Sequence, residues 1–180
     1  MSNGHGTQVK KRNGSVEQLN LEKIHKVVEE ACEGLGGGVS SSQVEMNSGI
    51  QLYDGITTDE IQEILIRSAS DLISLETPNY QFVAARLLLY GLKKQVFADV
   101  WANGHPPVLE HVRRCVERGV YDAGIIDKYN ASEWETIESF VDHDRDYLFT
   151  YAGIRQVADK YLVQDRSLSL IHISEPTRPN

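Results

Sequence analysis

Apolar residues recur at every third or fourth position through much of the chain, which is the spacing of one buried face of an α-helix. Thr57 and Glu60 form a capping box at the start of one such stripe, and Pro78 suits the first turn of the next. A run of glycines, residues 36–38, ends the earliest stripe. The pattern predicts three amphipathic helices, over residues 20–35, 57–72 and 78–94.

Short apolar segments separated by turn residues occur at two places. Asn13-Gly14 lies between two such segments, so residues 7–19 are predicted to form a β-hairpin. Residues 50–53 look extended and precede Asp54-Gly55, which predicts a third strand ending in a turn. A run of three serines can cap a short helix around Val44. The expected N-terminal unit is therefore a bundle of four helices capped by three short strands.

The second half of the chain carries shorter helical stripes. Asn103-Gly104 and Pro106-Pro107 break helices, so a boundary is expected within residues 101–107, and the first compact unit should end near residue 100. Three short helices are predicted beyond it, at residues 109–119, 130–140 and 151–161. Residues 1–6 are polar and are expected to form a flexible N-terminus.

Charge and cysteine content restrict the function. A net charge of −8 over 180 residues and a pI near 5.2 argue against a protein built to hold nucleic acid, which needs a broad basic face. No run approaches the roughly 18 apolar residues of a membrane span. Cys32 and Cys115 have neither disulfide nor zinc-ligand spacing, so reduced and buried thiols are expected. The sequence thus predicts a cytoplasmic protein without a membrane or nucleic-acid partner.

The predicted hairpin concentrates basic residues, Lys10, Lys11 and Arg12, immediately before its turn. In an acidic protein such a triplet is ordinarily a solvated face, so the register of the hairpin matters. A two-residue turn pairs Lys10 with Glu17 and sends Lys11 to the opposite face. A three-residue loop pairs Lys11 with Ser15 and puts Lys11 and Glu17 on one face. Only the second register gathers the charges needed for a ligand site.

Several blocks of the sequence resemble an ATP-cone domain, beginning with Lys11-Arg12-Asn13-Gly14-Ser15. The blocks occur in the family's order, at residues 11–24, 53–61 and 80–94. Three further blocks look like the segment that leads into the catalytic barrel of class Ia ribonucleotide reductase large subunits, at residues 111–121, 140–146 and 161–164. The resemblance covers roughly residues 7–166.

The resemblance implies an allosteric site for ATP or dATP, with Mg²⁺ as a further candidate. Phosphates would lie between basic side chains and beside the N-terminus of the helix that Thr57 begins, while Glu17 and Asn20 would contact the base or sugar. The alternative is that Asn20 and Thr58 only cap helices and that the lysines are solvated. Gln62 stands where some relatives carry His, which bears on discrimination between ATP and dATP. The implied binding residues are Lys11, Arg12, Glu17, Asn20, Lys23, Thr58, Ile61 and Lys94.

The implied fold is mainly α with a small β cap: an ATP-cone at residues 7–100, then a helical lead-in at residues 101–166 to an absent ten-stranded α/β barrel. The complete relatives reduce ribonucleoside diphosphates with a radical-generating small (beta) subunit, and the large subunit forms homo-oligomers. The catalytic cysteines lie beyond this chain, so no catalytic residue is expected and the chain alone should be inactive.

Two other functions compete with this one. A nucleotide-sensing regulatory protein that carries an ATP-cone but is not an enzyme would show paired Cys-x-x-Cys elements at its N-terminus, and residues 1–7 contain no cysteine. A helical interaction module would bind no nucleotide.

Two further segments carry expectations of their own. The run Asp142–Asp146 contains metal-ligand residue types, but it lacks the glycine turn and distal glutamate of a calcium-binding loop, so a solvated junction with internal ion pairs and no metal is expected. The resemblance stops after Arg166, and residues 167–180 are expected to be a non-native tail.

Overall fold

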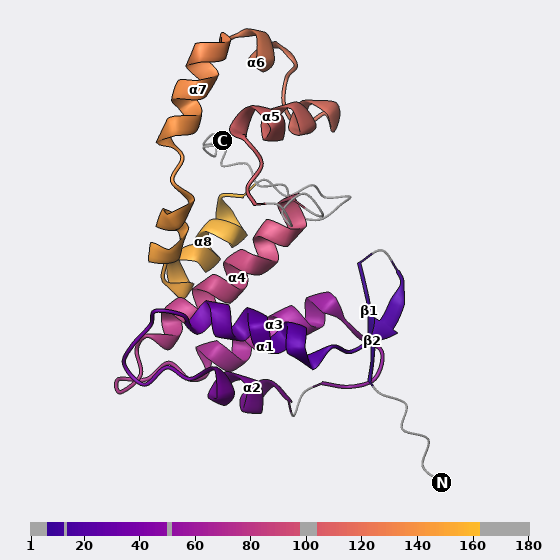
Figure 1. The fold of residues 1–180 in the computed structure, drawn as a ribbon, viewed down its shortest axis with the longest axis vertical. Helices are drawn as coiled ribbons and strands as arrows, with labels where there is room; N and C mark the ends of the chain where they lie inside the picture. Colours follow the sequence, from indigo (N-terminus) through magenta and orange to yellow (C-terminus); the bar gives the residue numbers. More distant parts are fainter. Residues whose placement is uncertain (1–6, 13, 50–51, 98–103, 163–180) are drawn as a thin grey trace.

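The computed structural model describes residues 7–12, 14–49, 52–97 and 104–162. These residues are mainly helical with a three-stranded sheet, as the sequence predicts. Figure 1 shows the sheet and the first three helices at one end and a second group of helices at the other. The helices are α1 (Leu21–Cys32), α2 (Ser41–Gly49), α3 (Thr58–Ser70), α4 (Tyr80–Phe97), α5 (Val108–Glu117), α6 (Gly124–Asp127), α7 (Ala131–Phe140) and α8 (Tyr151–Lys160), with the 3-10 helix η2 (His143–Leu148).

The small sheet has the order β2-β1-β3, with β1 (Gln8–Lys10) antiparallel to β2 (Val16–Gln18) and parallel to β3 (Ile56–Thr57). The expectation of a third strand at residues 50–53 was wrong. Residues 50 and 51 lie outside the described part of the chain, and the strand follows the Asp54-Gly55 turn instead of preceding it. Ile56 pairs with Val9 and is fully buried, so the strand forms where an apolar side chain reaches the core.

Helix α4 is the centre of the core. Its residues Val83, Ala84, Ala85 and Leu87 are completely buried, and α1, α3 and α8 all pack against it (Figure 1). Tyr80, at the start of α4, is also completely buried, and its hydroxyl accepts a hydrogen bond from the backbone of Ser40 at 2.9 Å and donates one to Gln43 at 2.6 Å. These bonds satisfy a buried hydroxyl and join α4 to the start of α2.

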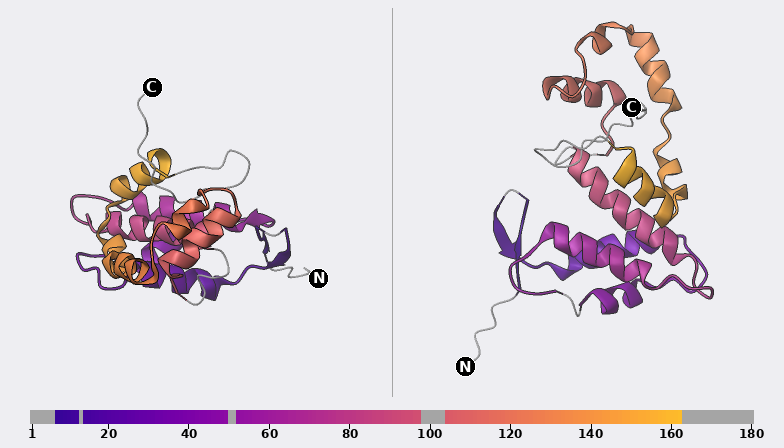
Figure 2. Two further views of the ribbon diagram at one scale, coloured as in Figure 1. Left: turned by 90° about the horizontal axis from the view of Figure 1, so that it is seen from above. Right: turned by 180° about the vertical axis from the view of Figure 1, so that it is seen from behind.

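Helices α5 and α7 pack together away from the main core, as the right-hand view in Figure 2 shows. The buried residues there are Val112, Cys115 and Trp134. The chain then returns through η2 to α8, whose Ile154 and Ala158 belong to the same core cluster as α4. The C-terminal described helix therefore stabilises the N-terminal bundle.

Three helix starts follow the expected capping signals, whereas α4 begins at Tyr80, so Pro78 lies before its first turn and not within it. The side chains of Asn20, Thr57 and Asn130 cap α1, α3 and α7. Helix α4 continues beyond the expected end to Phe97, whose ring packs edge-on against His111 at 5.3 Å between centroids.

Three expectations concern residues outside the described part of the chain. They are the flexible start at residues 1–6, part of the boundary at residues 101–103 and the non-native tail at residues 167–180. Among the described helices, none has the length and apolar character needed to cross a membrane.

Candidate functional site

The hairpin adopts the three-residue loop. The N–H of Lys11 donates to the carbonyl of Ser15 at 2.8 Å, and Gly14, with φ of +83°, donates to the carbonyl of Lys11 at 2.9 Å. A glycine tolerates this left-handed conformation without strain. Lys11 and Glu17 consequently share a face, with Lys11 Nζ 2.7 Å from Glu17 Oε2.

A cavity of about 270 Å³ opens beside this ion pair, between the hairpin, α1, α3 and α4. Its polar walls come from elements far apart in the sequence, and its deeper wall is apolar. Seven of the eight sequence-predicted binding residues line it: Lys11, Glu17, Asn20, Lys23, Thr58, Ile61 and Lys94. The fold therefore brings the predicted residues together around one space.

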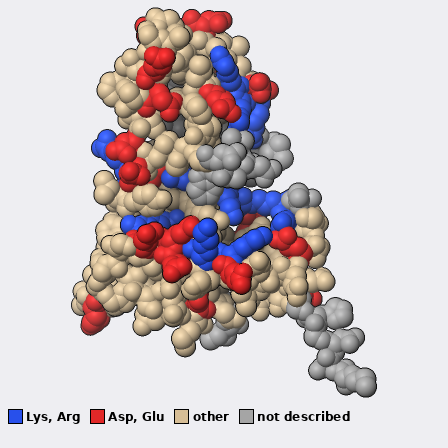
Figure 3. Space-filling model, viewed as in Figure 1, with Lys and Arg blue, Asp and Glu red and all other residues tan. Residues whose placement is uncertain are grey.

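The cavity lining is electropositive. It carries three lysines, Lys11, Lys23 and Lys94, against the single carboxylate of Glu17. The hydrogen bond from Lys11 holds the pKa of Glu17 below its ordinary value, so this carboxylate is charged at neutral pH. Figure 3 shows Lys and Arg side chains gathered across the middle of the face that it draws, with acidic groups beside them. Such a lining suits an anion with several negative charges.

Two helix starts contribute to the walls. Asn20 Oδ1 accepts from the N–H of Lys23 at 3.0 Å, so Asn20 is both the cap of α1 and a lining residue. Thr57 caps α3 by accepting from the N–H of Glu60 at 3.1 Å, and Thr58, the first helical residue, lines the cavity. The cap of α3 is therefore made by Thr57, and Thr58 is not the capping residue that the alternative interpretation expected. The N-terminus of α3 adds a favourable dipole for a negative group.

Arg12 is the predicted binding residue that does not line the cavity. Its Nη2 lies 2.6 Å from Asp59 Oδ1, and its Nε donates to the same oxygen at 2.7 Å. Asp59 stands in the first turn of α3, so the pair fastens the tip of the hairpin to the start of that helix.

Gln62 occupies a tight position between α3 and α4. Its amide nitrogen donates to the carbonyl of Leu87 at 2.6 Å, and a Cβ at Gly91 would lie 3.0 Å from its Cγ. The side chain is thus held by a backbone acceptor while still forming part of the cavity wall.

Sequence reasoning missed several lining residues. Tyr90 is the most informative, because it stands one turn before Lys94 on α4 and its ring centroid lies 4.4 Å from Lys94 Nζ. The i, i+4 spacing of an aromatic residue and a lysine was visible in the sequence. The other missed residues are apolar or neutral and carry no separate signal: Val9, Gln18, Leu19, Ile24, Val27 and Leu65.

Both cysteines are free, and Cys115 is buried while Cys32 is half-buried. Desolvation raises the pKa of Cys32 to about 11, so its thiol is protonated and unreactive at neutral pH. Cys115 is buried as expected, whereas Cys32 is less buried than expected.

Residues 7–95 match the ATP cone domain family, and over these residues the chain belongs to it. Ribonucleoside-diphosphate reductase 1 subunit alpha of Escherichia coli (strain K12) is 46% identical over 167 residues, which are 92% of this chain and 21% of that protein. The alpha subunit of Haemophilus influenzae is 45% identical over 169 residues, with the same shares covered. That of Enterobacteria phage T4 is 39% identical over 164 residues, 90% of this chain and 21% of that protein.

The chain spans about a fifth of the length of these relatives and is homologous to their N-terminal region. It does not cover their catalytic part.

Proposed function

We propose that the cavity beside α3 binds ATP and dATP, and that this chain is the activity-regulating region of a ribonucleoside-diphosphate reductase alpha subunit. The observation that carries the proposal is the convergence of Lys11, Lys23 and Lys94, from three different elements, on one cavity of an ATP-cone. A nucleoside triphosphate has the dense negative charge that such a lining recognises.

The triphosphate would lie between the three lysines and the N-terminus of α3. Lysine ammonium groups give charge-assisted hydrogen bonds to phosphate oxygens, and the helix start supplies N–H donors and a positive dipole. Arg12 would join the phosphates by turning from Asp59, since both side chains are partly exposed and Arg12 follows the cavity-lining Lys11 in the chain. Mg²⁺ would accompany the phosphates, which are its usual ligands in nucleotide sites.

The nucleoside would lie on the side of the cavity formed by Glu17 and Asn20. Their side chains offer acceptors for the base amino group or ribose hydroxyls, and Ile61 supplies an apolar surface for the base. ATP and dATP differ by one hydroxyl, and leaving a buried polar group unpaired costs about 1–3 kcal/mol. Small differences among these contacts are therefore enough to give ATP and dATP different affinities.

The regulatory role follows from linkage. A nucleotide shifts an assembly equilibrium only when it has different affinities for the two assemblies, so ATP would favour the active form and dATP the inhibited one. The partners would be the radical-generating beta subunit and further copies of the alpha subunit. The complete enzyme would reduce ribonucleoside diphosphates in the cytoplasm, while this chain alone would have no catalytic activity.

Isothermal titration calorimetry of the chain with ATP and with dATP tests the proposal. Saturable binding should be weakened at least tenfold by Lys94→Ala, because the loss of a charged hydrogen bond to phosphate costs about 1.5–3 kcal/mol. Lys26→Ala is the matched control, since Lys26 lies on α1 near Lys23 but outside this cavity. The absence of binding, or equal losses in both variants, would refute the proposed site.

A further inference from the structure

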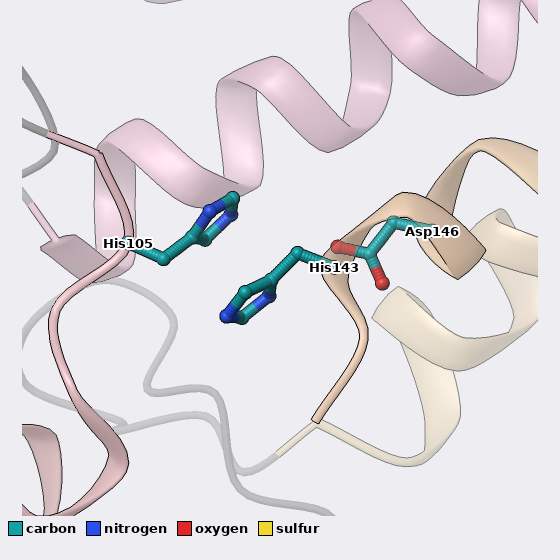
Figure 4. A group of neighbouring side chains, drawn as sticks. All are labelled: His105, His143 and Asp146. Carbon is teal, nitrogen blue, oxygen red and sulfur yellow. The ribbon is translucent and has the colours of Figure 1, made fainter. Parts of the chain in front are cut away.

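A second group of chemically competent side chains lies beside the C-terminal part of α4, where Asp146 pairs with Lys93. His105 precedes α5, while His143 and Asp146 belong to η2. One nitrogen of each imidazole and one carboxylate oxygen lie within 4.8 Å of one another. Figure 4 shows the three side chains near one another beside α4, with His105 on one segment and His143 and Asp146 on the other.

The histidine rings are arranged face to face. Their centroids are 3.6 Å apart and their planes differ by 6°. The Nε2 atom of His105 is buried and has no hydrogen-bond partner within the described part of the chain. Buried imidazole nitrogens ordinarily have a hydrogen-bond partner, so the absence of one at this atom needs an explanation.

We propose that His105, His143 and Asp146 bind a divalent transition-metal ion such as Zn²⁺, with water completing a four-coordinate site. Two imidazoles and one carboxylate are the mixed donors that Zn²⁺ and Co²⁺ prefer, whereas Mg²⁺ and Ca²⁺ favour oxygen ligands alone. All three residues are half-buried, which leaves access for the ion and for a solvent ligand.

Binding the ion needs a contraction and a rotation of at least one ring. Metal–donor distances of about 2.0–2.2 Å place tetrahedral donors roughly 3.3–3.6 Å apart, less than the present outer limit. Because an imidazole nitrogen donates in the plane of its ring, one of the two stacked rings must also turn before both nitrogens point at the same ion. His105 lies in a connecting segment and His143 begins a short 3-10 helix, so both can approach without disturbing a long helix. The bound ion would clamp the segment after α4 to η2.

Lys93 places a positive charge next to this group. Its Nζ lies 2.8 Å from Asp146 Oδ2, and its side chain is only 12% exposed. One carboxylate oxygen can stay on Lys93 while the other binds the metal, so Lys93 would orient the ligand in the way that outer hydrogen-bond partners do. The nearby ammonium also lowers the attraction for a cation, which predicts moderate and not extreme affinity.

The sequence did not reveal this group because His105 is distant in the chain from His143 and Asp146. For the run Asp142–Asp146 the sequence predicted a solvated junction without a metal, and the proposal departs from that prediction by taking His143 and Asp146 from the run. Asp142 accepts from the N–H of Asp144 at 3.1 Å as the cap of η2, and neither residue belongs to the cluster. The new element is His105, which only the fold brings to His143.

Titration of the full chain with Zn²⁺, without nucleotide, tests the inference. Wild type should bind one equivalent, and His105→Ala and His143→Ala should each weaken binding by more than about tenfold, since loss of even an outer-shell partner costs about 10–100-fold. Asp146→Asn keeps the side-chain shape and preserves the test if a histidine variant fails to fold. His25→Ala, on α1, is the control and should bind as wild type does.

Co²⁺ spectroscopy separates this site from the other candidate pair, His111 and Cys115, whose Nε2 and Sγ lie 3.6 Å apart. Tetrahedral d–d bands without a thiolate charge-transfer band would support the proposed ligands. A thiolate band, unchanged affinity in His105→Ala and His143→Ala, or no saturable binding by wild type would overturn the proposal.

Discussion

Lys11 Nζ and Glu17 Oε2 lie 2.7 Å apart across the hairpin, at the mouth of the cavity. The contact exists because a three-residue loop puts both residues on one face. It lowers the pKa of Glu17 chiefly through the hydrogen bond from Lys11. One pair thus links the conformation of a turn to the charge of the proposed nucleotide site.

This pair predicts a pH dependence. Because the folded pKa of Glu17 is depressed, the stabilisation is fully present above the ordinary value of 4.5 and is lost as the pH falls through the folded pKa. A ¹³C NMR titration of the Glu17 carboxylate should give a midpoint below 4.5, and Lys11→Ala should move it upwards. A midpoint that does not respond to Lys11→Ala would show that the pair is not formed in solution.

Thr57 and Thr58 are adjacent but are predicted to have separable roles. Thr57→Ala removes the cap of α3 and should lower the free energy of unfolding by about 1 kcal/mol, measured by urea denaturation. Thr58→Ala should leave stability nearly unchanged and weaken ATP binding by about fivefold, the equivalent of one hydrogen bond. Equal effects of the two variants on stability would contradict this division.

Much of this local structure could be predicted from the sequence because its signals are local. The hairpin between β1 and β2 and the Thr57–Glu60 capping box depend on signals within a few residues, and both form as expected. The position of the third strand depended on whether Ile56 or an earlier segment pairs with Val9. No local pattern specifies such a contact, because the two residues are distant in the sequence. The cluster at His105 was missed for the same reason.

The family resemblance predicted most of the residues of the candidate site, but it did not predict how their side chains are arranged. Arg12 belongs to the same motif as Lys11, yet it turns to Asp59 because the tip of the hairpin lies over the start of α3. Tyr90 lines the cavity because α4 runs along it. The path of α4 depends on how the helices pack together.

Asp59 is predicted to restrain Arg12. Asp59→Asn removes the ion pair and a carboxylate near the phosphates, so ATP affinity should rise by up to about fivefold, the range of an exposed ion pair. Calorimetry of a double-mutant cycle with Arg12→Ala gives the coupling. If Asp59→Asn raises affinity equally with and without Arg12, Asp59 does not restrain Arg12.

Gly91 is predicted to be required for the packing of α4 on α3. An alanine Cβ would approach Gln62 Cγ to 3.0 Å, and Gln62 is held by the Leu87 carbonyl. Overpacking of about 1–3 kcal/mol should outweigh the gain in helix propensity of about 1 kcal/mol, so Gly91→Ala should destabilise the protein. Thermal denaturation of Gly91→Ala with and without Gln62→Ala checks this, because the second change should relieve the clash. A Gly91→Ala variant more stable than wild type would contradict the packing.

The most direct test of the proposed nucleotide site is a two-dimensional NMR titration of the ¹⁵N-labelled chain, methyl-labelled at isoleucine, with ATP. The account predicts saturable shifts of the Lys23 and Thr58 amides and the Ile61 methyl groups, while Ile126 on α6, remote from the cavity, stays unchanged. Absence of shifts at these three positions, or saturable shifts confined to α5–α7, would contradict it.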